Sequence, residues 1–274
     1  MLYKRIITAV PLGLLAIWFI ITQPTNAMLY ALLLINLIAG WEWARLSGIQ
    51  LPVLRVVYAL LIVASSFGLY WMQEQQASVF AVVMVFSVIL WTLIIYRMST
   101  RDPAAASERF SSLKILFGFL TLLPPVLALL YLHQQTQGGY WMLYVISMIW
   151  VADTGAYVAG KTFGKVKLVP KLSPGKTREG LYGAVLATSL YSLAAAVFFE
   201  LTLIQTLMLL IIGFFATLLS IAGDLFISLL KRERGVKDTG TILPGHGGML
   251  DRIDSITSSA PFFAILLHSV IFNV

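Results

Sequence analysis

The stretch "LIQTLMLLIIGFFATLLSIAGDLFISLL", Leu203–Leu230, is long enough to cross a bilayer as one helix and contains a single ionised residue, Asp224. A polar segment, "KDTGTILPGHGGMLDRID" at Lys237–Asp254, follows it with five charges, a histidine and four glycines. Such residues are too costly to place in hydrocarbon. The pairing of these two segments indicates a membrane protein with chemistry at the membrane edge.

The composition supports this class. Of 274 residues, 59% are hydrophobic and only 11% are charged, whereas about 25% of the residues in a soluble domain are charged. The mean hydropathy is +0.89. The chain has no cysteine, which excludes structural disulfides, thiolate zinc sites and cysteine nucleophiles.

Nine apolar runs approach the length that spans a bilayer, about 20 residues. Each must be helical, because a backbone exposed to lipid has to satisfy its own N–H and C=O groups. We therefore expect an all-α integral membrane protein with about nine transmembrane helices. Lys4 and Arg5 before the first run also suit a signal peptide, but no convincing cleavage site follows. The nine runs are residues 6–22, 27–43, 53–72, 77–96, 115–132, 140–159, 181–199, 203–230 and 256–272.

The positive charges orient these spans. With nine spans, all 19 lysines and arginines fall in or beside the loops of one side. Because basic residues collect in cytoplasmic loops, we expect a cytoplasmic N-terminus and a C-terminus on the opposite side. The chain is predicted to be one polytopic domain, 1–274. In it, 1–114 form the N-terminal spans, and 115–274 form the spans and cytoplasmic loops that carry the site.

Acidic residues within the spans are the first candidates for a site. Asp224, Ser228 and Lys231 share one helix face, at positions i, i+4 and i+7. Asp153 lies in a similar place near the end of the sixth run. A structural interpretation of either aspartate is an interhelical hydrogen bond or a salt bridge to a nearby lysine.

Asp251 and Asp254 precede the last run, three residues apart. Helix capping would explain one carboxylate but not both. If Asp224 faces them, three carboxylates converge, and hard oxygen ligands of this kind suit magnesium, which also binds water and substrate phosphates. Asp238 is a weaker fourth candidate. Positive charge that suits phosphates surrounds the same place in Lys231, Arg232, Lys237 and Arg252.

Two further residues have open interpretations. His246 lies among glycines, so its imidazole could donate to a phosphate, or the residue could only lock the turn. Glu42, in "GWEWARLSG", is expected to pair with Arg45 and is given no role in the site.

Two segments carry a family resemblance. "SLLKRERGVKDTGTILPGHGGMLDRID", Ser228–Asp254, resembles the signature of the phosphatidate cytidylyltransferase family, also called CDP-diacylglycerol synthase. The matching elements are a serine, a Lys-Arg pair, a Lys-Asp pair, His-Gly-Gly and a closing Asp-Arg-x-Asp. "ADTGAYVAGKTFGKVKLVPKLSPGKTREG", Ala152–Gly180, is similar to the family's other marked region. One departure is Arg178, where the family is expected to carry an aromatic residue in many members.

The resemblance implies a magnesium-dependent reaction of CTP with phosphatidic acid that gives CDP-diacylglycerol and pyrophosphate. It also implies metal ligands, for which we assign Asp224, Asp251 and Asp254. The residues assigned to catalysis are these three with Lys237 and Arg252. Those expected to bind phosphates or the nucleotide are Ser228, Lys231, Arg232, His246, Lys171, Ser173, Lys176, Arg178 and Asp153.

The expected partners are CTP, phosphatidic acid and the lipid bilayer, with a homodimer as a further expectation and no nucleic acid. The expected location is the cytoplasmic (inner) membrane, with the site facing the cytoplasm. A second cation such as potassium is an open expectation beside magnesium. The alternative function is a polytopic transporter or channel for an anionic substrate, although the internal inverted repeats typical of transporters are not visible.

Overall fold

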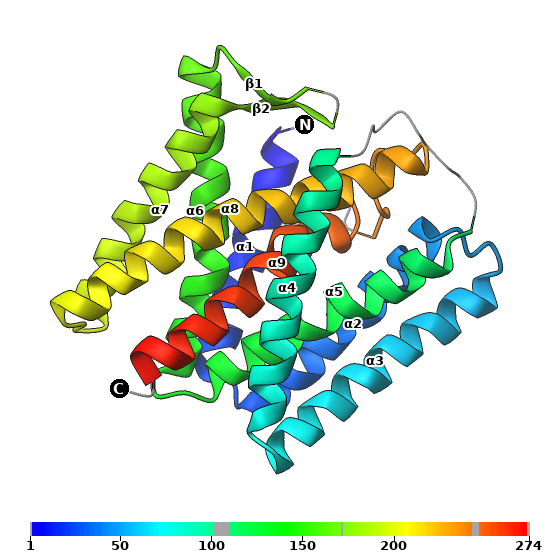
Figure 1. Ribbon diagram of the computed structural model, residues 1–274, viewed down its shortest axis with the longest axis horizontal. Helices are drawn as coiled ribbons and strands as arrows, with labels where there is room; N and C mark the ends of the chain where they lie inside the picture. The colour runs from blue at the N-terminus through cyan, green and yellow to red at the C-terminus, as the bar shows by residue number, and fades with distance from the viewer. Residues whose placement is uncertain (1, 101–109, 171, 243–246, 273–274) are drawn as a thin grey trace.

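The computed structural model describes residues 2–100, 110–170, 172–242 and 247–272 (Figure 1). Within them the chain forms nine α-helices, a short π-helix and one two-stranded hairpin. Each predicted span lies within one helix to within one residue, except that the last also includes the π-helix, so the all-α polytopic prediction is confirmed. The helices are α1 (Leu2–Thr22), α2 (Thr25–Leu46), α3 (Pro52–Gln75), α4 (Ser78–Thr100), α5 (Ser112–His133), α6 (Gly138–Phe163), α7 (Arg178–Phe198), α8 (Leu203–Glu233) and α9 (Leu250–Leu267), which continues as the π-helix η1 (His268–Phe272).

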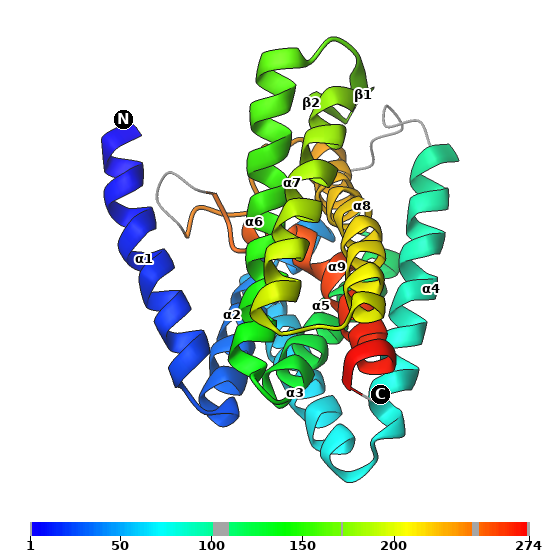
Figure 2. The same cartoon turned by 90° about the vertical axis from the view of Figure 1, so that its left-hand side faces the viewer.

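Eight helices in the described part of the chain, α2 to α9, are long and apolar enough to cross a membrane. In α1, the apolar segment Gly13–Thr22 is shorter than a full span. The start of α1 and the end of η1 lie towards opposite ends of the bundle (Figures 1 and 2). Which end faces the cytoplasm stays a prediction from the charges.

The loop after α6 forms a hairpin that the all-α prediction did not include. Strand β1 (Lys167–Val169) pairs antiparallel with β2 (Ser173–Thr177). Helix α7 starts directly after β2, and the side chain of Thr177 accepts a hydrogen bond from the N–H of Gly180 at 3.1 Å. The hairpin lies at the same end of the bundle as the start of α1 (Figure 1). A residue on β2 is therefore fixed relative to the helices beneath it.

Helix α5 is the most buried span and lies near the centre of the bundle with α9. Its residues from Thr121 to Leu130 are all buried, and it packs against α2, α3, α4, α6 and α9. The indole N–H of Trp91 on α4 donates to the carbonyl of Thr257 on α9 at 3.0 Å. These contacts hold α9 in position from several sides.

Helices α8 and α9 touch closely at Gly223. The hydroxyl of Ser258 on α9 donates to the carbonyl of Leu219 on α8 at 2.7 Å. A Cβ atom at Gly223 would overlap the carbonyl oxygen of Asp254 and lie 2.5 Å from the Ser258 hydroxyl. Small residues permit such close helix approaches in membranes. The contact places the next residue of α8, Asp224, beside Asp254.

Gly223→Ala should therefore destabilise the protein, whereas Gly68→Ala on α3 should not. Nothing lies within 4 Å of a Cβ built at Gly68, so the alanine there gains up to about 1 kcal/mol of helix propensity. At Gly223 the overlap should cost about 1 to 3 kcal/mol. Thermal unfolding of both variants in detergent measures the difference. Equal stability of the two variants would contradict the close contact.

Candidate active site

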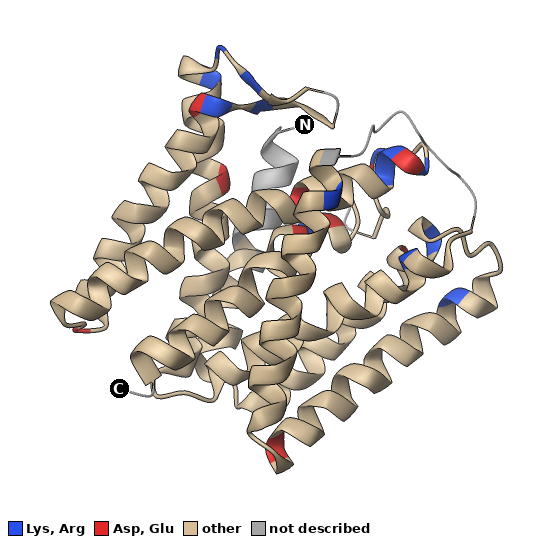
Figure 3. Cartoon of the chain, in the orientation of Figure 1, with Lys and Arg blue, Asp and Glu red and all other residues tan. Residues whose placement is uncertain are grey.

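Charged side chains gather towards the end of the bundle that carries the hairpin, and few lie at the other end (Figure 3). Some acidic residues lie deeper, within the bundle, near the start of α9. The segment between α8 and α9 folds back into the bundle, so α9 begins below the level of the hairpin (Figure 1). Charged residues therefore extend from the polar end of the protein to the start of α9 within the bundle.

The deepest part of this region holds two adjoining carboxylates. Asp254 on α9 is only 8% exposed, and its carboxyl group interacts directly with that of Asp224 on α8. Lys176, from strand β2, forms an ion pair with Asp224. The hydroxyl of Ser228 lies 3.5 Å from Oδ1 of Asp224, and the N–H of Ser255 donates to Oδ1 of Asp254 at 2.7 Å. The pair is thus shared by two helices and partly neutralised by the hairpin.

Asp153 on α6 faces the same place. It interacts electrostatically with Lys176, Asp224 and Arg252. A cavity of about 200 Å³ lies beside these residues, lined by Asp153, Lys176 and Thr177 among others. The structure therefore brings four of the predicted site residues together, Asp153, Asp224, Asp254 and Lys176, with Arg252 close enough to interact.

Asp251 has a different surrounding from the other two predicted metal ligands. Its Oδ1 accepts from Lys231 Nζ at 2.7 Å. Its Oδ2 accepts from the N–H and hydroxyl of Thr239, at 2.8 and 3.0 Å, and from the N–H of Gly248 at 3.0 Å. Both oxygens are thus engaged within the protein. Across the described ranges, no three acidic or histidine side chains form a group that could hold a metal ion. Asp224 and Asp254 adjoin each other, whereas Asp251 is engaged separately, and metal binding by these residues stays a prediction.

Glu42 on α2 is a structural anchor that the sequence interpretation missed. It is 3% exposed and does not make the expected pair with Arg45, whose guanidinium donates instead to the backbone carbonyl of Asp238 at 3.3 Å. The Thr239 hydroxyl lies 2.8 Å from Oε2 of Glu42, so its one proton is shared between this carboxylate and that of Asp251. The Glu42 carboxylate also accepts from the two N–H groups at the start of α9. These are Met249 N to Oε1 at 3.0 Å and Leu250 N to Oε2 at 2.8 Å. The signal in the sequence was an acidic residue between two tryptophans within a span.

The remaining predicted residues lie at the polar end. Arg232, Lys237 and Asp238 are exposed at the end of α8 and in the loop that follows. Ser173 starts β2 and Arg178 is exposed at the start of α7. Lys171 and His246 lie outside the described residues, so their predicted roles stay predictions.

The chain is similar to known proteins over nearly its whole length. A family model described as the cytidylyltransferase family matches residues 3–270. A protein of Pseudomonas aeruginosa named phosphatidate cytidylyltransferase is 37% identical over 268 residues, which cover 97% of each chain. One of the same name from Haemophilus influenzae is 32% identical over 292 residues, 99% of this chain and 100% of the relative. Another from Staphylococcus haemolyticus is 32% identical over 269 residues, 96% and 98% of the two chains.

Glu42→Ala should loosen the segment that leads into α9. It would leave the N–H groups of Met249 and Leu250 without their acceptor in a place with little water, at a cost of about 3 kcal/mol. We expect a lower unfolding temperature in detergent and faster tryptic cleavage at the exposed Lys237.

The matched control is Glu74→Ala, because the carboxylate of Glu74 is exposed at the other end of the bundle and accepts from side chains, among them Gln134 at 2.6 Å. Equal effects of the two substitutions would show that Glu42 does not anchor α9.

Proposed function

The chain belongs to the cytidylyltransferase family, and on that premise we propose that it transfers the cytidylyl group of CTP to phosphatidic acid. The products are CDP-diacylglycerol and pyrophosphate. The curated relatives, matched over nearly their whole length, are named for this activity. The observation that supports it best is the carboxylate pair of the buried Asp254 and the partly exposed Asp224, with Lys176 beside it.

The reaction requires charge neutralisation more than proton transfer. A phosphate oxygen of phosphatidic acid, already anionic at neutral pH, attacks the α-phosphorus of CTP. The new bond joins the two phosphates, and the bond from the α-phosphorus to the bridging oxygen of pyrophosphate breaks. Since no proton has to be removed from the nucleophile, a general base is unnecessary. Catalysis then comes from holding two polyanions together in line.

Asp224 and Asp254 fit a divalent cation of the magnesium type. Two adjoining carboxylates repel each other, and a cation between them and the substrate phosphates would relieve this repulsion. Magnesium usually takes one or two carboxylates and fills its remaining positions with water and phosphate oxygens. When bound, it would withdraw charge from the phosphates. Asp251 fits this role less well because Lys231, Thr239 and Gly248 occupy its oxygens. A second cation such as potassium stays a prediction.

The cationic side chains take three proposed roles. Lys176 reaches the carboxylate pair from the hairpin, and with Ser173 and Arg178 it is our candidate for binding the triphosphate of CTP. Arg252, one turn before Ile256 on α9, interacts with Asp153 near the same place and is our candidate for binding the lipid phosphate.

Lys231 instead balances the charge of the buried Asp251, so we assign it a positioning role. Ser228 supports Asp224.

The transporter alternative is not supported. The family match covers residues 3–270, and the named relatives are transferases over nearly the whole chain.

The protein is a multi-pass membrane protein. We place it in the inner membrane because its relatives, matched over nearly the whole chain, are bacterial. We place the site on the cytoplasmic face because the basic loops lie on one side of the predicted spans. CTP would then reach the site from the cytosol and phosphatidic acid from the inner leaflet. The expected homodimer stays a prediction, which light scattering of the detergent-purified protein would test.

Asp254→Asn should lower kcat/KM for CTP and phosphatidic acid about 100-fold to 1000-fold, the range seen when one group that stabilises transition-state charge is removed. The amide oxygen can still accept from the N–H of Ser255, so the fold should persist. The assay follows transfer of label from CTP into the lipid fraction as magnesium is varied. Glu200→Gln, in the loop between α7 and α8, is the control. Unchanged turnover by Asp254→Asn would remove the pair from the catalytic site.

Because the chain contains no cysteine, single introduced cysteines can report which side each loop faces. Lys165→Cys lies in the exposed loop before the hairpin, and Gln76→Cys in the exposed turn between α3 and α4. A membrane-impermeant maleimide applied to intact spheroplasts should label Gln76→Cys and should reach Lys165→Cys only after lysis. The opposite pattern would invert the proposed orientation.

A further inference from the structure

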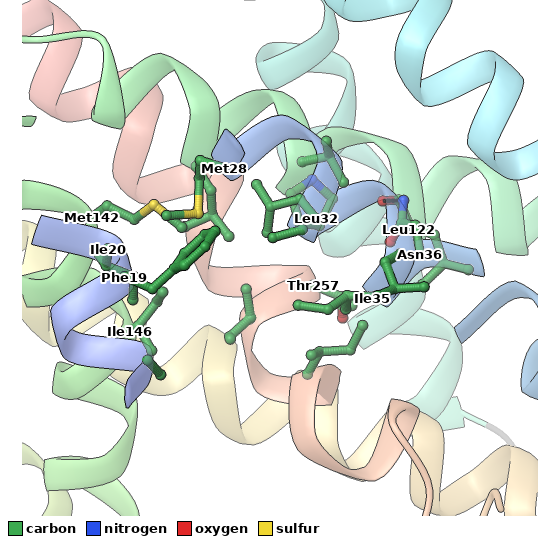
Figure 4. Close-up of a pocket in the computed structure, with 18 of the residues that line it drawn as sticks. Phe19, Ile20, Met28, Leu32, Ile35, Asn36, Leu122, Met142, Ile146 and Thr257 are labelled. Atoms are coloured by element: carbon green, nitrogen blue, oxygen red, sulfur yellow. Dashed lines mark hydrogen bonds between the residues drawn. The ribbon is translucent and has the colours of Figure 1, made fainter. Parts of the chain in front are cut away.

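A cavity of about 650 Å³ lies within the helices (Figure 4). Residues of α1, α2, α5, α6 and α9 line it, and all but two of their side chains are apolar. The two polar ones already have partners. The side-chain amide of Asn36 donates to Ser66 Oγ at 3.1 Å and to the carbonyl of Leu122 at 3.0 Å. The hydroxyl of Thr257 donates to the carbonyl of Asp254 at 2.6 Å. The lining therefore suits hydrocarbon and offers little to a polar ligand.

One end of the cavity adjoins the candidate active site. Ile253, Ile256 and Thr257 line it, and they belong to the same turns of α9 as Asp254. A lipid whose phosphate lies at the carboxylate pair would therefore have its hydrocarbon next to this end.

The cavity has an open rim and a closed far end. Three of its lining residues, Leu15 on α1, Leu34 on α2 and Trp150 on α6, are 56%, 59% and 46% exposed, and such apolar surface faces lipid in a membrane protein. Figure 4 shows Met28, Met142 and Ile20 gathered away from Asn36 and Thr257. Met28 and Met142 are only 2% and 1% exposed, so they close the far end.

Helix α1 forms the outer wall and is held at one end. The ring of His133 at the end of α5 contacts the carbonyl of Ile20 at 3.1 Å and the hydroxyl of Thr25 at 3.0 Å. Figure 2 shows α1 at the edge of the bundle, diverging from α6 towards its start. The wall is therefore fixed near the closed end of the cavity.

The length of the cavity matches a lipid chain. On α2 the lining runs from Met28 to Asn36, about 12 Å at 1.5 Å per residue, close to the roughly 15 Å of hydrocarbon in one leaflet. The apolar lining, whose two polar side chains already have hydrogen-bond partners, suits a single hydrocarbon chain.

We infer that this cavity holds one acyl chain of the phosphatidic acid substrate, and that Met28 and Met142 at its far end limit the chain length. The inference rests on the proposed function, which supplies a diacyl phosphate lipid as substrate. The second chain would remain in the bilayer, since the described cavity has room for one.

Ala31→Phe tests the inference, because Ala31 lines the cavity on α2 close to Met28. The added ring should lower kcat/KM for dipalmitoyl phosphatidic acid about tenfold and leave that for dihexanoyl phosphatidic acid unchanged. Ala194→Phe, at an exposed position on α7, is the matched control and should change neither value. Equal loss with both substrates, or no loss with either, would overturn the inference.

A binding measurement separates this inference from the proposed function. Phosphatidic acid with a diazirine at the end of one acyl chain should label peptides that contain Met28 or Met142. Unlabelled phosphatidic acid should compete, and phosphatidylcholine with the same chains should not. Labelling elsewhere, or equal competition by phosphatidylcholine, would mean that the cavity holds no substrate chain. Absence of turnover by the unaltered protein with every phosphatidic acid would overturn the proposed function instead.

Discussion

The contact between α8 and α9 at Gly223 places Asp224 against Asp254, and the other parts of the site follow from the repulsion between these two carboxylates. Asp254 is buried and has little water to screen its charge, so a positive group near the pair reduces the repulsion between the two carboxylates. Lys176 supplies it, although it belongs to a hairpin outside the helices. The hairpin is thereby tied to the centre of the bundle, where Asp153 adds a further carboxylate from α6.

A second constraint comes from starting α9 within the bundle. The first N–H groups of a helix have no partners within that helix, and hydrocarbon cannot supply them. Glu42 accepts from the N–H groups of Met249 and Leu250, while Asp251 accepts from those of Thr239 and Gly248. Asp251 is therefore needed to fix the chain before α9 and does not join the pair. Its charge is balanced by Lys231.

The spans could be predicted well from the sequence because lipid leaves a transmembrane backbone few alternatives. The meeting of Asp224 with Asp254 also followed from their positions at the ends of consecutive spans. The different roles of Asp251 and Asp254 could not be predicted from the sequence, because residues three apart lie on the same helix face. Which of the two carboxylates binds the preceding loop depends on how that loop folds.

Two other features were not predicted, for different reasons. Glu42 is separated from Leu250 by most of the protein, so no local pattern connects them. The hairpin was missed because strands of three and five residues, one with proline and glycine, show almost no alternation.

One face of α9 carries a charged residue of the site and another face lines the apolar cavity, just as a phospholipid has a charged headgroup and apolar chains. Asp254 lies with the charged groups, while Ile253 and Ile256, on either side of it in the sequence, line the apolar cavity. Since both sets belong to one helix, a movement of α9 would carry the phosphate site and the hydrocarbon site together. The distance between a lipid phosphate and its chain is fixed by covalent bonds, so it has to match a distance that is equally fixed in the protein. One rigid helix, held by Glu42 at its start and by Gly223 and Ser258 against α8, meets that requirement more simply than two elements that move separately.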